Sequence, residues 1–96
     1  MGEVLHEYTS EVADEDGHVY SARAMGGRRK GATVWEGWLE FTPRGGGGMI
    51  RQSPIETTQP NRKAVLYWAG GLEPVYLEGA LERAITSRSE GRTRSK

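Results

Sequence analysis

The segment VWEGWLEF, residues 34–41, and the segment YWAGGLEPVYLEGALERAI, residues 67–85, together decide the fold of this chain. The first alternates apolar and polar residues with the period of a strand, whereas the second repeats apolar residues at the spacing of a helix. This change of period predicts strands followed by helices, which is an α+β arrangement. All three tryptophans, Trp35, Trp38 and Trp68, fall within these two segments.

Alternation across residues 33–41 divides the side chains of this strand between two faces. Leu39 and Phe41 share a face with Trp35, and this face is predicted to meet the core. The opposite face carries the residues that we expect to form a partner or oligomer surface: Trp38, Val34, Glu36 and Glu40. Trp38 is the reason for this expectation, because its large apolar area needs a loop or another subunit to cover it.

Two upstream segments are predicted to form a hairpin. Residues 3–13 and 18–25 alternate in the same way, and the turn between them contains an Asp-Gly pair that tolerates positive φ. The basic segment 26–31 then predicts an exposed hairpin tip, and residues 49–52 can add a short edge strand. The expected sheet is therefore a three- to four-stranded antiparallel meander.

The C-terminal part is predicted to be helical, beginning near Gln59. Thr58 offers an N-cap hydroxyl, and Pro60 suits a first turn because it has no donor to lose. A Gly-Gly pair then interrupts the helix before it restarts at Pro74, so we expect one helix or a kinked pair on one face of the meander. The predicted core residues are Trp35, Leu39, Phe41, Val65, Trp68, Leu72, Leu77 and Leu81.

The length and composition of the chain predict one small domain that associates. We expect residues 1–86 to form this single domain, and residues 87–96 to be a disordered basic tail because they lack apolar side chains. A domain of this size, with 35% hydrophobic residues, has a small core. Association would bury more apolar area, so a homo-oligomer, dimeric or larger, is predicted.

Cysteine is absent, which excludes disulfides, thiolate metal sites and a cysteine nucleophile. No apolar run approaches the roughly 18 residues that a membrane helix needs. The segment 1–10 also lacks the basic and apolar regions of a signal peptide. We therefore expect a cytoplasmic protein with no membrane partner.

The formal net charge is zero, but the charges are segregated along the chain. Residues 1–22 carry six acidic and no basic side chains, whereas residues 23–63 carry eight basic and three acidic ones. Such blocks usually pair between the strands of a small sheet, and a basic patch for an anionic partner is the alternative. Arg28, Arg29 and Lys30, on the predicted tip, are the candidate anion-binding residues, and further basic residues, Arg23, Arg44, Arg51, Arg62, Lys63 and the basic tail, could support them. They would suit nucleic acid, although the zero net charge makes this partner less favoured.

No residue pattern indicates catalysis. Serine and threonine occur without a nucleophile elbow, and the glycine run 45–48 precedes a predicted strand instead of the helix of a phosphate-binding loop. His6 and His18 could meet across the hairpin beside acidic residues, but their spacing matches no metal motif. We predict no catalytic, cofactor-binding or metal-binding residue, and we favour a protein that is not an enzyme.

The junction between the last strand and the helix is the remaining candidate site. It consists of four polar residues: Glu56, Thr57, Thr58 and Gln59. Their simplest role is helix capping, with Thr58 accepting bonds from helix amides and Glu56 near the positive end of the helix dipole. The alternative is a small polar pocket that binds a ligand without converting it. Trp35, Trp68 and Tyr67 would form its rim, and Tyr76 could also reach it.

The segments WEGWLEF, ETTQP and YWAGGLEPVYLEGALERA resemble an uncharacterised family of small bacterial proteins. The resemblance covers residues 18–85 and implies one intact domain of common descent. It implies no catalytic residue, ligand or partner. The expected function is a non-enzymatic interaction module that homo-oligomerises through its sheet, and the alternatives are nucleic-acid binding and small-ligand binding.

Overall fold

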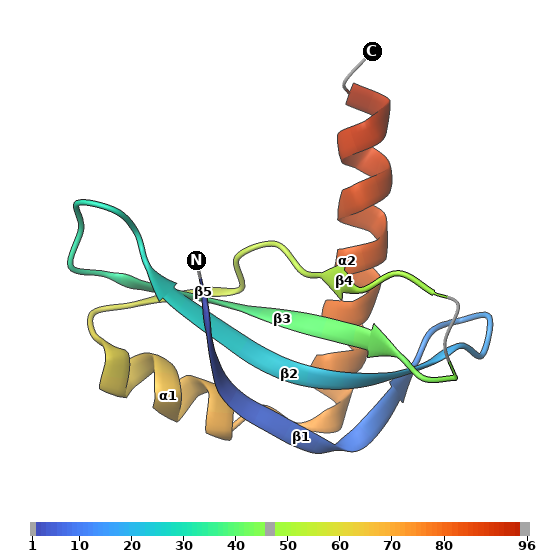
Figure 1. Cartoon of the computed structure of the whole chain (residues 1–96), viewed down its shortest axis with the longest axis horizontal. Helices are drawn as coiled ribbons and strands as arrows, with labels where there is room; N and C mark the ends of the chain where they lie inside the picture. Colours follow the sequence, from blue (N-terminus) through green and yellow to red (C-terminus); the bar gives the residue numbers. More distant parts are fainter. Residues whose placement is uncertain (1, 46–47, 95–96) are drawn as a thin grey trace.

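The computed structural model describes residues 2–45 and 48–94, with side chains up to Thr86. The elements in this part of the chain are β1 (Glu3–Ala13), β2 (Val19–Arg28), β3 (Trp35–Pro43), β4 (Arg51–Gln52), β5 (Thr57–Gln59), α1 (Arg62–Gly70) and α2 (Pro74–Arg94). The strands form one antiparallel sheet in the order β1-β2-β3-β4, and β5 pairs with β3 next to β4 (Figure 1). The predicted α+β fold, a meander packed by C-terminal helices, is confirmed.

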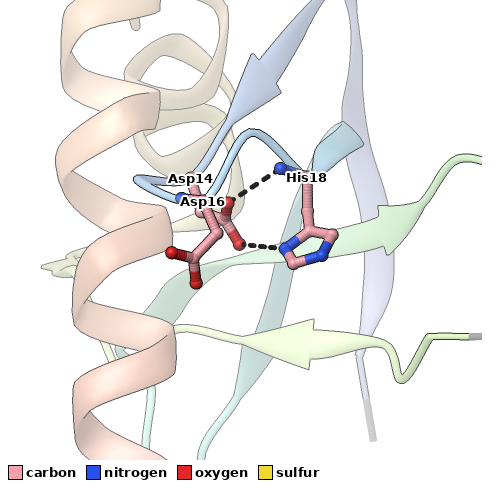
Figure 2. Close-up of side chains that lie close together, drawn as sticks. All are labelled: Asp14, Asp16 and His18. Atoms are coloured by element: carbon pink, nitrogen blue, oxygen red, sulfur yellow. Dashed lines mark hydrogen bonds and ion pairs between the residues drawn. The ribbon is translucent and has the colours of Figure 1, made fainter.

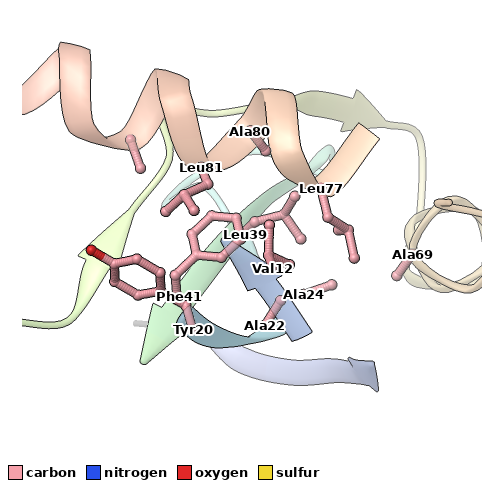
Figure 3. Close-up of a cluster of buried hydrophobic side chains, with 11 residues drawn as sticks. Val12, Tyr20, Ala22, Ala24, Leu39, Phe41, Ala69, Leu77, Ala80 and Leu81 are labelled. Atoms are coloured by element: carbon pink, nitrogen blue, oxygen red, sulfur yellow. The ribbon is translucent and has the colours of Figure 1, made fainter. Parts of the chain in front are cut away.

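Both helices pack on one face of the sheet, which we call the inner face; the other is the outer face. The buried cluster between the helices and the inner face comprises Val12, Tyr20, Ala22, Ala24, Leu39, Phe41, Ala69, Leu77, Ala80, Leu81 and Ala84 (Figure 3). Five predicted core residues are the largest fully buried side chains: Leu39, Phe41, Val65, Leu77 and Leu81. The other three, Trp35, Trp68 and Leu72, are only partly buried.

Two glycines let side chains from other elements reach the inner face. Gly26 and Gly37 are cross-strand partners in β2 and β3. A Cβ atom built on Gly37 would lie 2.7 Å from Cζ3 of Trp68, and one built on Gly26 would lie 2.7 Å from Cδ1 of Leu5. Gly26 therefore belongs to the sheet and not to the hairpin tip as predicted, because strand pairing continues to Arg28.

The edge strand β1 does not alternate regularly. Its register with β2 shifts near Leu5 and again between Glu7 and Glu11, which leaves residues of β1 without a partner in β2. These bulges allow Leu5 and Tyr8 to pack against the core. Tyr8 Oη donates to the carbonyl oxygen of Ala69 at 2.6 Å, so the edge strand is tied directly to α1.

The segment that contains β4 and β5 pairs with successive parts of β3. Between the two short strands, Ser53 supplies the contacts that a regular strand would make. Its N–H donates to the carbonyl oxygen of Leu39 at 2.9 Å, and its Oγ accepts from the N–H of Leu39 at 3.0 Å. The Glu56 N–H then donates to the carbonyl oxygen of Gly37 at 2.8 Å. This continuous bonding holds the segment along β3 as far as Gln59.

The predicted helix start near Gln59 is wrong, because residues 57–59 pair with β3. The helix begins instead at Arg62, and Asn61 is its N-cap: Oδ1 of Asn61 accepts from the N–H of Ala64 at 2.8 Å. The predicted interruption and the restart at Pro74 are confirmed.

The second helix, α2, continues past the sheet to Arg94 and projects from the body of the domain (Figure 1). It includes most of the segment 87–96, for which the sequence predicts disorder. The side chains of this segment lie outside the described part, and its disorder stays a prediction. Within that part, neither helix is long and apolar enough to cross a membrane.

The close contact between Gly37 and Trp68 predicts a sensitive position. Gly37→Ala should lower the free energy of unfolding by about 2 kcal/mol, because the new methyl group would overlap the indole. Urea unfolding measures this loss. Gly70→Ala is the matched control, since this helical glycine has nothing within 4 Å of its Cβ position and alanine there should stabilise by about 0.5 kcal/mol. Unchanged stability of Gly37→Ala would contradict the packing described.

Candidate functional site

The carboxylate of Glu56 joins the segment that contains β4 and β5 to α2. Its side chain is 5% exposed. Oε1 accepts from Tyr76 Oη at 2.6 Å and from Arg83 Nη2 at 2.8 Å, and Oε2 accepts from Arg83 Nε at 3.0 Å. The guanidinium of Arg83 also lies over the Tyr76 ring, with Cζ 5.3 Å from the ring centroid. We call these three residues the Glu56 clasp.

The electrostatics of the Glu56 clasp favour one protonation state. Burial alone raises the pKa of Glu56, but hydrogen bonds from Arg83 and Tyr76 and the positive charge of Arg83 outweigh it, so this pKa is lowered. Burial, followed by the hydrogen bond to Glu56, raises the pKa of Tyr76 to about 12. The carboxylate therefore stays charged and the phenol neutral around neutral pH, which suits a structural contact better than proton transfer.

The four polar junction residues do not converge on one pocket. Strand pairing places Thr57 and Gln59 on the inner face and Thr58 on the outer face. Gln59 Nε2 donates to Thr57 Oγ1 at 2.7 Å. The capping role predicted for Thr58 and Glu56 is wrong, because Asn61 caps α1 and Glu56 contacts α2.

The predicted basic tip is exposed, and it is partly neutralised. Arg28 ends β2, while Arg29 and Lys30 lie in the connection to β3. Arg29 pairs with Glu36, with Nε 2.9 Å from Oε2. Within the described ranges, Arg28 and Lys30 have no carboxylate partner. Two of the three predicted anion-binding residues are thus available to a ligand.

Other segregated charges pair between elements. Glu3 of β1 pairs with Arg62 of α1, and Glu11 of β1 pairs with Arg44, just after β3. Arg23 of β2 pairs with Glu40 of β3. Two of these connect the acidic first strand to the basic middle of the chain. Pairing between elements, the usual outcome of such charge blocks, is confirmed for these residues.

The predicted partner surface lies on the outer face. Glu36, Trp38 and Glu40 follow one another along that face of β3, and Val34 lies half-buried just before the strand. Glu40 is only 8% exposed. It accepts from Arg23 Nε at 2.6 Å and from Gln52 Nε2 at 3.1 Å. Since Glu36 pairs with Arg29, both glutamates of this surface have partners within the chain.

Three apolar side chains cross the outer face in one row. Val4 lies opposite Met25, and Met25 lies opposite Trp38. We call Val4, Met25 and Trp38 the outer apolar row. Gly2 packs against the Trp38 indole, since a Cβ atom on Gly2 would lie 2.6 Å from Cζ2. The start of the chain therefore covers part of the tryptophan that was predicted to need a partner, and Val4 is left 40% exposed.

The turn between β1 and β2 is organised by Asp14 (Figure 2). Its Oδ1 accepts from the N–H groups of Asp16 at 3.0 Å and His18 at 2.9 Å, and its Oδ2 lies 3.3 Å from Nδ1 of His18. Partial burial raises the pKa of Asp14, but the hydrogen bonds and the imidazole outweigh it and lower the pKa overall. Ligand atoms of the three side chains lie within 4.8 Å of one another. Both Asp14 oxygens are engaged, so the geometry of the turn accounts for the cluster.

The two histidines do not meet, contrary to the arrangement considered from the sequence. His6, in β1, lies opposite Ala24 of β2, and its ring contacts that of Tyr8 at a tilt of 56°, with ring centroids 4.7 Å apart. His18 lies in the turn, just before the start of β2. The length of the hairpin separates them, because pairing between the two strands runs from Ala13 to Glu3.

A groove lies beside α1, where the helix leaves the edge of the sheet. It is shallow and open to solvent, has a volume of about 620 Å³, and is lined by Gln59, Asn61, Lys63, Ala64, Tyr67 and Trp68. We call it the α1 groove. Its lining is mostly apolar, and Tyr67 is 86% exposed. A second hollow, about 710 Å³ beside the Asp14 turn, differs from the α1 groove because both acidic and basic side chains, including Asp14, Arg44 and Arg51, line it.

Sequence patterns identified the α1 groove only in part. Gln59, Trp68 and Tyr67 were included in the candidate pocket, and Lys63 was counted among the basic residues that could bind an anion, whereas Asn61 was missed. The sequence feature that could have indicated this groove is the first turn of the helix, which contains Arg62 and Lys63 and no acidic residue. Because the helix was predicted to start near Gln59 and not at Arg62, Asn61 was not recognised as its N-cap.

Comparisons with family models, curated proteins and solved structures gave no match for this chain. Its function therefore has to be inferred from its own surfaces.

The Glu56 clasp should contribute measurably to stability. Glu56→Gln is expected to lower the free energy of unfolding by about 2 kcal/mol at neutral pH, because it removes charge-assisted hydrogen bonds from Arg83. Arg44→Gln is the control, since its exposed pair with Glu11 should contribute at most about 0.5 kcal/mol. Urea unfolding of the three proteins tests this, and equal losses in both variants would argue against the clasp.

The stability difference between wild type and Glu56→Gln should depend on pH. The pKa of Glu56 is lower in the folded than in the unfolded state, so the contribution is complete above the unfolded value of about 4.3. It is lost as the pH falls through the folded value. Unfolding of both proteins between about pH 7 and about pH 3 should show the difference shrinking at the acidic end. A difference that stays constant would contradict a charged clasp.

Proposed function

We propose that this protein is a non-enzymatic interaction module that forms a homodimer through the outer face of its sheet. The outer apolar row carries the proposal, because Val4, Met25 and Trp38 cross three strands on the face that neither α1 nor α2 covers. A two-fold axis through this face would place the row of one copy against the same row of the other. Each copy would then cover the exposed parts of Val4 and Trp38 of the other, whereas Met25, only 9% exposed, is already buried within the chain.

The charges around the row support close approach of two copies. Glu40 has Arg23 and Gln52 as partners, and Glu36 has Arg29. Because these carboxylates are neutralised within each chain, two outer faces can meet without placing unpaired like charges together.

The composition of the inner core supports association as well. Five of the eleven residues of the buried cluster are alanines. Because alanine has a small side chain, the core buries little apolar area per residue. Burial of the outer row in a dimer would add to the stability of the fold.

The polar clusters support a role without catalysis. Both oxygens of Glu56 are bonded to Arg83 or Tyr76, and those of Asp14 hold the hairpin turn. These groups serve the fold. We place the module in the cytoplasm, which its lack of cysteine favours.

Size-exclusion chromatography with light scattering tests the dimer. The wild-type protein should elute with twice the chain mass of 10.6 kDa at high micromolar concentration. Trp38→Ala and Val4→Glu should both shift it to the monomer, the first by removing apolar area and the second by adding a charge to the row. Val4 is 40% exposed, so the second variant should still fold.

The matched control is Val75→Ala, which shortens a 75% exposed apolar side chain on α2. This variant should stay dimeric. A wild-type protein that elutes as a monomer, or a dimer that both outer-face variants leave intact, would refute the proposal.

A further inference from the structure

We propose that the α1 groove binds single-stranded nucleic acid, a function separate from association through the outer face. The groove joins features that the sequence separates: exposed aromatic rings, unpaired cations and two amide side chains at one end of the sheet. Figure 1 shows the start of α1 and the β2–β3 hairpin at this same end.

Aromatic rings form the wall of the groove. Trp68 is held in place because its ring lies over Gly37, and it still lines the groove. Tyr67, the residue before Trp68 in α1, is 86% exposed and does not pack against the core. Trp35 is not part of the lining but lies nearby, two residues before Gly37 on the same inner face of β3, and it is half-buried. Such rings stack on unpaired bases with little dependence on base identity.

One cation lines the groove, and a second lies on the same face of the sheet. Arg28 is the cross-strand partner of Trp35, and Trp35 is the partner of Gln59, which lines the groove. Directly opposite residues on paired strands point to the same face, so Arg28 lies about 10 Å from Gln59 on the inner face. Lys63 lines the groove itself, and no carboxylate does. The site is therefore locally positive in a protein of zero net charge.

The start of α1 carries a charge conflict that an anion would relieve. Arg62 and Lys63 occupy the first turn, where the positive end of the helix dipole disfavours cations. Glu3 offsets Arg62, with Oε2 2.6 Å from Nη2. Lys63 has no carboxylate partner in the ranges that the structure describes. A phosphate group at this point would be favoured by both the lysine and the helix end.

Two amide side chains beside the rings can contact base edges. The cap of α1 uses Oδ1 of Asn61, which leaves its NH₂ group as a donor. Gln59 donates through Nε2 to Thr57, which leaves its Oε1 as an acceptor. Unpaired bases expose donors and acceptors on their Watson–Crick edges, whereas a duplex hides those edges and its base faces. The groove therefore suits a single strand better than a duplex.

Fluorescence anisotropy with labelled oligonucleotides tests this inference. DNA and RNA strands of about eight mixed-sequence nucleotides, within the range that small single-strand-binding folds occupy, should bind more tightly than the matching duplexes at low salt. If about three phosphates are neutralised, the logarithm of the binding constant should fall with that of the salt concentration with a slope of about −2.

Two groove variants separate stacking from charge. Tyr67→Ala should weaken binding about tenfold, because it removes one stacking surface, and the salt slope should stay the same. Lys63→Gln should also weaken binding, and it should reduce the salt slope by about 0.7. Both side chains are exposed, so thermal unfolding of these variants should match the wild type.

Val75→Ala and Arg44→Gln are the controls. Val75 is an exposed apolar residue on α2, and Arg44 lies just beyond the other end of β3. Both variants should bind like the wild type. Absence of binding at low salt, equal affinity for single strands and duplexes, or an unchanged affinity in Tyr67→Ala would overturn the inference. Failure of the dimer test would leave it standing, because Trp38 and Tyr67 lie on opposite sides of the sheet.

Discussion

The contact of the Trp68 indole with Gly37 is the constraint on which the architecture depends. The inner face of β2 offers small side chains such as Ala22 and Ala24, so the sheet alone cannot fill the space beneath the helices. The missing side chains at Gly26 and Gly37 let Leu5 and Trp68 enter from other elements. This entry brings α1 close to the sheet, and it brings the bulged β1 against the same core. It also fixes one ring of the α1 groove.

The spacing of apolar residues in the sequence was sufficient to predict the core residues of the regular strands and helices. The five largest buried side chains, among them Leu39 and Leu77, were predicted because each lies on the apolar side of a regular strand or helix. The bulges of β1 could not be predicted, since they arise from pairing with β2 and leave no mark in the local pattern. Thr58 and Pro60 gave a consistent local signal for a helix start. Pairing of residues 57–59 with β3 overrode that signal, as tertiary contacts often do with local propensity.

The candidate sites show the same limit of local patterns. Glu56 was included in the predicted junction site, and Tyr76 was considered as a side chain that could reach it. The contact with Arg83, 27 residues away along the chain, was not predicted. Alternation placed Trp38 on the outer face, whereas its partial cover by Gly2 depends on the path of the N-terminal residues. Sequence reasoning of this kind finds unusual residues more readily than it finds their neighbours.

Net charge is a poor guide to this protein, and the structure explains why. Pairs such as Glu3–Arg62 and Glu11–Arg44 neutralise the acidic and basic blocks where the elements meet. This pairing does not reach Lys63, which lies beside rings that stay partly exposed. The formal net charge of zero therefore hides a local difference. Most charges are paired between elements, whereas the α1 groove is positive. Phosphate binding depends on the local field and on counterions released near the contact, so such a groove can attract a polyanion although the whole chain does not.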